Sequence, residues 1–258
     1  MKAIILAGGL GTRLGKYTEN LPKGMLNFAG KSLIERQIET LRKCGIKEII
    51  VTRKHLKEKI NFPDVKYDDK EQDDSNMVSD FMHARREFDD DLILCYGDII
   101  YEPSVLKELI KSKAEISVVA DKDWKEYWIA RLGDWRNDSE SFVVRGKKLV
   151  SLGMPNPPEN LMDARYVGMI KFSKKSLKKI EDIYDALSEK IGWETKWSYS
   201  KSFKKAYMTD LVQELIENGF NVEAVLISHK WMEFDTAEDY EKANDWLDKG
   251  TLKRFINL

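Results

Sequence analysis

The 258-residue sequence has few cysteines and no long hydrophobic run, and each shortage excludes a class of protein. Cys44 and Cys95 are the only cysteines and form no Cys-x-x-Cys unit, which argues against a zinc site and predicts a reducing compartment. No apolar segment approaches the roughly 20 residues of a membrane helix. The apolar run at the N-terminus is too short for a secretion signal. We therefore expect a cytoplasmic protein that does not associate with membranes.

The sequence also has almost no net charge. Its 43 Lys and Arg residues balance 44 Asp and Glu residues, which leaves a formal net charge of −1. Proteins that bind nucleic acids normally carry a basic patch, so this balance predicts no nucleic-acid partner. The three histidines, at positions 55, 83 and 229, are scattered along the chain and are predicted to be structural or surface residues.

A glycine-rich segment begins directly after the first apolar run, residues 3–7. That run is short and stops at glycines, which predicts a buried parallel strand. Gly8, Gly9 and Gly11 allow a sharp turn that brings backbone N–H groups close to a phosphate. Arg13 and Lys23 supply positive charge near the same point. The segment therefore predicts a binding site for a nucleoside triphosphate.

Two better-known glycine motifs do not fit this segment. The Walker loop ends in Gly-Lys-Ser/Thr, whereas residues 15–17 are Gly-Lys-Tyr. The dinucleotide fingerprint needs a third glycine where this chain has Leu14. It also needs an acidic residue after the second strand, where residues 53 and 54 are basic. A nicotinamide or flavin site is therefore not expected.

The spacing of apolar residues predicts alternating strands and helices in the first half of the chain. The expected strands are 3–7, 46–52, 92–96 and 115–120, and the expected helices are 32–43, 76–88 and 104–111. Such alternation predicts an α/β fold with a doubly wound, mostly parallel central sheet.

The pattern changes after Asp121. Short strands are expected at 141–145, 148–152, 165–172 and 222–227, with helices at 174–187 and 207–218 and an irregular segment at 192–205. A final helix is expected after Thr236, with Asp239 completing a capping box. The length suits one domain over residues 1–258, with a nucleotide-binding half (1–120) and an acceptor-binding half (121–258) that forms a small elaboration.

Two aspartates follow predicted strands. Asp98 comes after the run 92–96, and Asp235 ends the extended segment 222–234. Ligands of open α/β sheets bind at the carboxyl ends of strands, and a hard divalent cation prefers oxygen ligands. Glu233 lies two residues before Asp235 and would face the same side of a strand.

Three motifs follow one another in a fixed order near the start of the chain. Residues 6–14 (Leu-Ala-Gly-Gly-x-Gly-Thr-Arg-Leu), 22–26 (Pro-Lys-x-Met-Leu) and 30–34 (Gly-Lys-Ser-Leu-Ile) follow one another at the N-terminus. Together they resemble the signature of the sugar-nucleotide pyrophosphorylase superfamily. Its members transfer a nucleotidyl group from a nucleoside triphosphate to a phosphorylated small molecule and release pyrophosphate.

The resemblance implies a Rossmann-like nucleotidyltransferase fold and a set of site residues. Lys23 and Arg13 would be catalytic, with Lys23 at the α-phosphate or the incoming phosphate and Arg13 at the departing groups. Asp98 and Asp235 would hold Mg2+. The expected nucleotide-binding residues are Leu6, Ala7, Gly8, Gly9, Gly11, Thr12, Ser75, Asn76 and Asp98. Ser75 and Asn76 either contact the base or only cap the helix that starts there.

The rest of the chain resembles the phosphocholine- and phosphonate-type cytidylyltransferases. The motifs that carry this resemblance are 75–78, 96–102, 121–131, 166–172, 205–210 and 231–240. The chain departs from that pattern at Ser75, where threonine is expected, and at 79–81 (Ser-Asp-Phe), where a Ser-Leu pair is expected. The predicted acceptor-binding residues are Trp124, Trp128, Arg131, Tyr166, Lys171, Lys205, Trp231 and Glu233.

Two kinds of acceptor remain open. The tryptophans, with Tyr127, would form a cage for a quaternary ammonium, or they are core residues. Arg131, Lys171 and the lysines of segment 196–205 favour a carboxylate or a phosphonate instead.

We therefore predict transfer of a cytidylyl group from CTP to a small phosphorylated or phosphonate acceptor. The acceptor would be of the phospho-amino-acid, aminoalkylphosphonate or phosphocholine type, and the product would serve surface glycan or lipid decoration. The alternatives are a sugar-1-phosphate uridylyl- or thymidylyltransferase and a non-catalytic nucleotide-sensing subunit. A homo-oligomer is left open.

Overall fold

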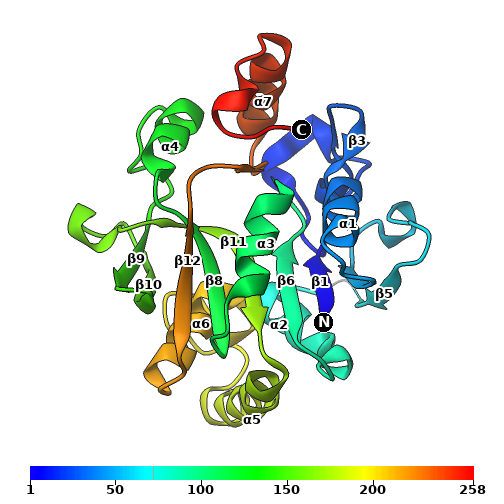
Figure 1. The fold of residues 1–258 in the computed structure, drawn as a ribbon. Coiled ribbons are helices and arrows are strands. Elements are labelled where there is room, and N and C mark those ends of the chain that lie inside the picture. The colour runs from blue at the N-terminus through cyan, green and yellow to red at the C-terminus, as the bar shows by residue number, and fades with distance from the viewer. Residues whose placement is uncertain (72) are drawn as a thin grey trace.

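The structure is a computed structural model that describes residues 1–71 and 73–258. The strands of its central sheet are β1 (Lys2–Leu6), β4 (Glu48–Arg53), β5 (Lys66–Asp69), β6 (Leu92–Tyr96), β8 (Ile116–Asp121), β9 (Glu140–Arg145), β10 (Lys148–Pro155), β11 (Arg165–Phe172) and β12 (Val222–Ile227). Their order across the sheet is β5-β4-β1-β6-β11-β8-β12-β10-β9 (Figure 1).

The sheet is mostly parallel, as the sequence predicts. Strands β5, β4, β1 and β6 are parallel neighbours, and so are β8 and β12. Strand β11 lies antiparallel between β6 and β8. Strand β10 is antiparallel to both of its neighbours and forms a hairpin with β9 at one edge. The antiparallel direction of β11 decides which of its residues reach the site described below.

Helices cover both faces of the sheet. They are α1 (Leu33–Lys43), α2 (Met77–His83), α3 (Pro103–Lys111), α4 (Trp124–Leu132), α5 (Lys174–Ile191), α6 (Met208–Glu217) and α7 (Ala237–Asp248). Side chains of α1, α3, α4 and α7 pack with Ile5 on one face, and those of α2, α5 and α6 pack with Ile4 on the other. The doubly wound α/β arrangement is confirmed (Figure 1). The division into halves at residue 120 stays a prediction.

Several elements differ from the expectations. The expected helix 76–88 is the shorter α2, followed by a 3-10 turn at Arg85–Glu87. Helix α4 and strand β5 were not expected. In α4 the large aromatics Trp124, Tyr127 and Trp128 recur at the spacing of one helix face and are buried, and the rings of Tyr127 and Trp128 pack with that of Trp231. At the start of α7, the capping box of Thr236 and Asp239 is present as expected.

The strand expected at 222–227 is β12, and the extended segment that follows it to residue 234 contains one strand of a short antiparallel ribbon. This ribbon consists of β7 (Ile99–Tyr101) and β13 (Trp231–Glu233), and Glu233 pairs with Ile99. The backbone N–H of Phe234 then donates to the carbonyl oxygen of Asp98 at 3.0 Å. This pairing places Asp98 and Asp235 side by side.

Within the described residues, no helix combines the length and the apolar character needed to cross a bilayer.

Gly97 follows β6 directly and lies where the chain packs closely against the end of β1. A Cβ atom at Gly97 would lie 2.6 Å from the carbonyl oxygen of Leu6 and 3.2 Å from the Cα of Ala7. Backbone cannot move aside cheaply, so we expect Gly97→Ala to lower the free energy of unfolding by about 1–3 kcal/mol in urea titrations. Gly9→Ala is the control, because a Cβ there meets no heavy atom within 4 Å. Its stability should stay within about 0.5 kcal/mol of wild type. Equal stability of the two variants would contradict this packing.

Candidate active site

A cavity of about 590 Å³ opens at the carboxyl ends of β1 and β6. Every predicted nucleotide-binding residue lines it: Leu6, Ala7, Gly8, Gly9, Gly11, Thr12, Ser75, Asn76 and Asp98. The predicted catalytic pair, Arg13 and Lys23, and the predicted metal ligand Asp235 line it as well. The structure thus brings these residues together, while their individual roles stay predictions.

In the glycine-rich loop after β1, at least one glycine is required by the backbone conformation itself. Gly11 adopts φ 66°, in the left-handed region that residues with a Cβ atom rarely occupy. A Cβ atom there would also lie 3.1 Å from the Cβ of Lys23. Gly11 therefore sets the path of the loop and lets it pass close to Lys23.

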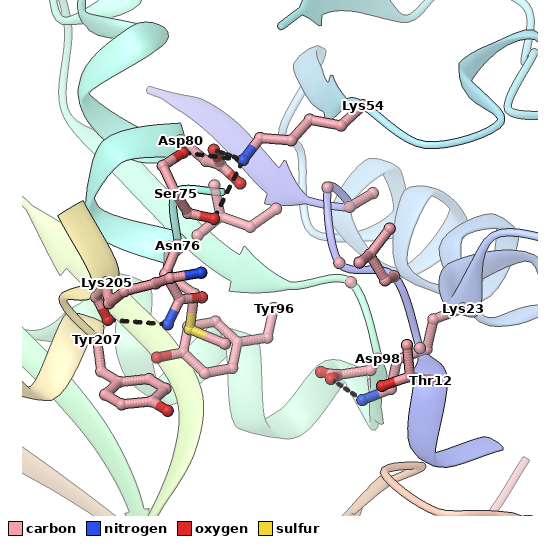
Figure 2. Close-up of a pocket in the computed structure, with 18 of the residues that line it drawn as sticks. Thr12, Lys23, Lys54, Ser75, Asn76, Asp80, Tyr96, Asp98, Lys205 and Tyr207 are labelled. Carbon is pink, nitrogen blue, oxygen red and sulfur yellow. Dashed lines mark hydrogen bonds and ion pairs between the residues drawn. The ribbon is translucent and has the colours of Figure 1, made fainter. Parts of the chain in front are cut away.

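Lys23 is the charged centre of the cavity. Its Nζ lies 2.5 Å from Oδ2 of Asp98 and 2.5 Å from Oδ1 of Asp235, and Figure 2 shows the contact with Asp98. Burial alone would lower the pKa of Lys23, but the charges of Asp98 and Asp235 outweigh it and raise the pKa. Burial likewise opposes the charge on Asp235, yet Lys23 and Arg13 hold the pKa of that carboxyl well below its usual range. Both groups therefore carry full charge at neutral pH.

Arg131 lies behind this centre. Its guanidinium is buried, donates to Asp239 at 2.7 and 3.0 Å, and contacts Glu233 and Asp235. Asp239 in turn accepts from the backbone N–H of Asp235 at 3.1 Å. Arg131 lines neither this cavity nor the second cavity described below, which corrects its prediction as an acceptor contact. It positions Asp235.

A cluster of lysines and carboxylates closes the other end of the cavity. Nζ of Lys54 lies 2.5 Å from Asp80 and 3.1 Å from the hydroxyl of Ser75, and Figure 2 shows these contacts. Lys70 also donates to Ser75, and burial raises the pKa of Asp80. The sequence prediction missed Lys54 and Asp80 as cavity residues. The signal for Lys54 was its place directly after β4.

Asn76 does not cap α2 through its side chain. Its Nδ2 instead donates to the carbonyl oxygen of Lys205 at 3.1 Å (Figure 2). The interpretation of Asn76 as a simple helix cap is therefore wrong. Lys205, predicted to bind the acceptor, lines this first cavity next to Asn76.

A second cavity of about 550 Å³ continues from the first. Seven residues line both cavities, among them Arg13, Asp98 and Asp235. Of the predicted acceptor residues, Tyr166 and Glu233 line the second cavity. The sequence prediction did not include Arg165, Asp138 or Glu140, which line it too.

The predicted aromatic cage is corrected by the structure. Trp124, Trp128 and Trp231 are at most 2% exposed and line neither cavity. The guanidinium groups of Arg131 and Arg165 lie 5.0 and 4.6 Å from the ring of Trp128. The aromatic surface that a quaternary ammonium would need is therefore covered by the protein's own cations and by core packing.

The structure also corrects the prediction that Lys171 binds the acceptor. It lies near the end of β11, opposite Ile93 and Ser117 at the starts of β6 and β8. Its Nζ donates to the carbonyl oxygen of Ser112. Because β11 runs antiparallel to β6 and β8, its last residues lie at the sheet edge away from the cavity.

Carboxylate oxygens suited to a divalent cation meet where the two cavities join. Asp98 and Asp235 converge on the one ammonium of Lys23. Oxygens of Asp138, Glu233 and Asp235 lie within 4.8 Å of one another. Hard oxygen donors of this kind fit Mg2+.

The chain is similar to several known proteins in sequence and in fold. The sequence profile of the MobA-like NTP transferase domain matches residues 3–157. The CTP:phosphoglutamine cytidylyltransferase of Campylobacter jejuni is 34% identical over 253 residues, covering 93% of this chain and 98% of that relative. The choline-phosphate cytidylyltransferase of Streptococcus pneumoniae is 35% identical over 140 residues, covering 52% of this chain and 60% of that relative. The inositol-1-phosphate CTP transferase of T. maritima has a similar fold, with a TM-score of 0.72, 19% identity and coverage of 100% and 98%.

Lys23 is the residue whose loss should be most severe. We expect Lys23→Ala to lower the rate of nucleotidyl transfer by about 10²–10³-fold or more, because two carboxylates lose their shared cation and the phosphates lose a positive charge. The matched control is Lys16→Ala, since Lys16 is exposed and lies outside the residues that line the cavity. Pyrophosphate release measures the rate, and circular dichroism checks the fold. A folded Lys23→Ala protein with a rate near that of Lys16→Ala would contradict the assignment.

Proposed function

Because the chain belongs to the MobA-like NTP transferase family, we propose that it transfers a cytidylyl group from CTP to a small phosphorylated or phosphonate acceptor. The chain is a nucleotidyltransferase of this family. One observation carries the proposal: Asp98 and Asp235 line both cavities and pair with Lys23 of the first, so a triphosphate from one side would meet an acceptor from the other there.

The proposed reaction is an in-line displacement. An oxygen of the acceptor phosphate or phosphonate attacks the α-phosphorus of CTP, the bond to the β-phosphate oxygen breaks, and pyrophosphate leaves. The attacking oxygen is already anionic, so positioning and positive charge are needed more than a general base. Lys23 serves the α-phosphate or the attacking phosphate. Arg13, whose side chain is 64% exposed at the mouth of the cavity, serves the departing groups.

Two features support CTP as the donor. The relative from Campylobacter jejuni, which matches nearly the whole chain, is a cytidylyltransferase by name. The end of the first cavity that faces away from Lys23 holds the carboxylates of Asp73 and Asp80 beside Ser75 and Asn76. Carboxylates accept hydrogen bonds, and cytosine carries an exocyclic amino group that donates them, whereas uracil has a carbonyl at that position.

Mg2+ belongs to the same proposal. Asp98 and Asp235 would hold it, with Glu233 and Asp138 nearby. A bound Mg2+ would neutralise negative charge on the phosphates and on the departing pyrophosphate. Arg131 keeps Asp235 in position through Asp239.

The acceptor is proposed to be a phospho-amino-acid, an aminoalkylphosphonate or a phosphocholine-like compound. Use of CTP fits the cytoplasmic location predicted from the sequence. A role in surface glycan or lipid decoration and the formation of a homo-oligomer stay predictions.

A substrate panel tests the proposal directly. Pyrophosphate release would be measured with CTP, UTP, dTTP, ATP and GTP against phosphocholine, aminoethylphosphonate, phospho-amino-acids and hexose-1-phosphates. We expect release only with CTP and a non-sugar acceptor. Release restricted to UTP or dTTP with a hexose phosphate would instead establish a sugar nucleotidyltransferase. Binding of CTP without release for any acceptor would establish a nucleotide-sensing protein.

Removal of divalent cations tests the metal assignment. We expect excess EDTA to abolish pyrophosphate release and added Mg2+ to restore it. In Asp98→Asn, the Mg2+ concentration for half-maximal rate should rise by about tenfold or more, because one anionic ligand is lost. The control is Asp134→Asn, an exposed aspartate that binds Arg136. An unchanged rate of pyrophosphate release in excess EDTA would contradict the assignment of Mg2+ to this site.

A further inference from the structure

Arg165 has guanidinium N–H donors to which no described residue provides a hydrogen-bond acceptor. It is the first residue of β11, and its side chain is only 9% exposed. Within residues 1–71 and 73–258, its Nε and Nη1 have no hydrogen-bond partner. Arg165 lines the second cavity, which also contains Asp98 and Asp235. A buried donor without a partner is costly, so these atoms indicate a ligand that accepts hydrogen bonds.

The surroundings hold the guanidinium in place without using those donors. Its carbon atom lies 4.6 Å from the centre of the Trp128 ring. Asp138 and Glu140 each lie 3.6 Å from it, within ion-pair range but beyond a normal hydrogen bond. Arg165 is thus fixed by stacking and by charge, while its donors stay available to a bound molecule.

The other acids of this cavity are engaged by stronger partners. Asp210 accepts from the backbone N–H groups of Tyr199 and Tyr207 at 3.1 and 2.9 Å. Glu233 and Asp235 contact Arg131. Asp138 and Glu140 therefore remain as the acids beside Arg165, and together the three side chains carry one negative charge in excess when all are ionised. Burial raises the pKa of Glu140, which is the expected effect of a carboxyl group held away from water.

This charge pattern discriminates between ligands. A phosphate dianion at Arg165 would face two carboxylates and be repelled. A group with one carboxylate and one ammonium would satisfy both signs, with the carboxylate on the guanidinium and the ammonium on the acids. Carboxylate oxygens of Asp138, Glu233 and Asp235 lie within 4.8 Å of one another, so such a group would sit close to the transfer centre. The spacer between the two parts of the acceptor must therefore be short.

We infer that Arg165, Asp138 and Glu140 form the head-group site of the acceptor, and that this head group is zwitterionic, with a free carboxylate and an ammonium. The inference rests on the proposed function, and among the proposed acceptors it favours phosphorylated amino acids over compounds that lack a carboxylate.

Three small acceptors separate the parts of the head group. O-phosphoserine has both charges, O-phosphoethanolamine lacks the carboxylate, and phosphoglycolate lacks the ammonium. We expect wild type to have the lowest KM for O-phosphoserine. Arg165→Gln should raise that KM by about tenfold or more, and leave the KM values of O-phosphoethanolamine and CTP within about threefold. The control is Arg145→Gln, because Arg145 is exposed, lies 3.6 Å from Asp163 and lines neither cavity.

Asp138→Asn is a second variant that does not depend on the buried arginine. Asp138 is exposed and adopts φ 55°, a conformation that asparagine tolerates, so the fold should be kept. We expect the KM values of O-phosphoserine and O-phosphoethanolamine to rise by a larger factor than the KM of phosphoglycolate, which has no ammonium group to lose a partner. Asp134→Asn again serves as the control.

The possible results of these experiments separate the head-group site from the proposed cytidylyl transfer. Equal losses for all three acceptors in Arg165→Gln would overturn the inference and assign Arg165 to the phosphate. Calorimetric titration of the same three compounds measures head-group preference without turnover. Preference without pyrophosphate release would keep the site and reject the cytidylyl transfer. Release without any preference would keep the reaction and reject the site.

Discussion

The ammonium group of Lys23 joins three distant parts of the chain. Asp98 lies 75 residues after Lys23 and Asp235 lies 212 residues after it, yet both carboxylates are 2.5 Å from the same nitrogen. Two half-buried carboxylates at such proximity would repel each other without a cation between them. Lys23 therefore holds together the centre at which the two cavities meet, and the layout of the rest of the site follows from that contact.

The structure around this centre keeps the charges in place. The β7–β13 ribbon sets the backbone next to Asp98, and Phe234 donates across it. Arg131 and Asp239 then hold Asp235 from behind. The ring of Trp128 supports two arginines, Arg131 behind the centre and Arg165 in the second cavity. The tryptophans thus contribute to function through packing, even though the cavity walls do not include them.

The nucleotide side of the site could be predicted because its residues are local. The loop after β1, with Gly8, Gly11 and Arg13, lies within a few residues of one strand end, and strand ends on a parallel sheet share one edge. Asp98 follows β6 for the same reason. The acceptor side could not be predicted in this way. Its aromatic residues have the spacing of a helix face, and spacing alone does not tell whether that face lines a cavity or packs into the core.

The sequence alone determined the α/β class and the glycine loop, because each depends on patterns among neighbours in the chain. The charged residues Arg13, Lys23, Asp98 and Asp235 were predicted from the order of motifs that resemble a known family, and their roles stay predictions. Tertiary structure alone decided which end of β11 faces the cavity. Its antiparallel direction brings Arg165 and Tyr166 to the site and carries Lys171 to the opposite edge. It also decided the meeting of Asp98 and Asp235, because the pairing of β7 with β13 joins segments more than a hundred residues apart. Such pairings depend on how the whole sheet assembles, and no short stretch of sequence encodes them.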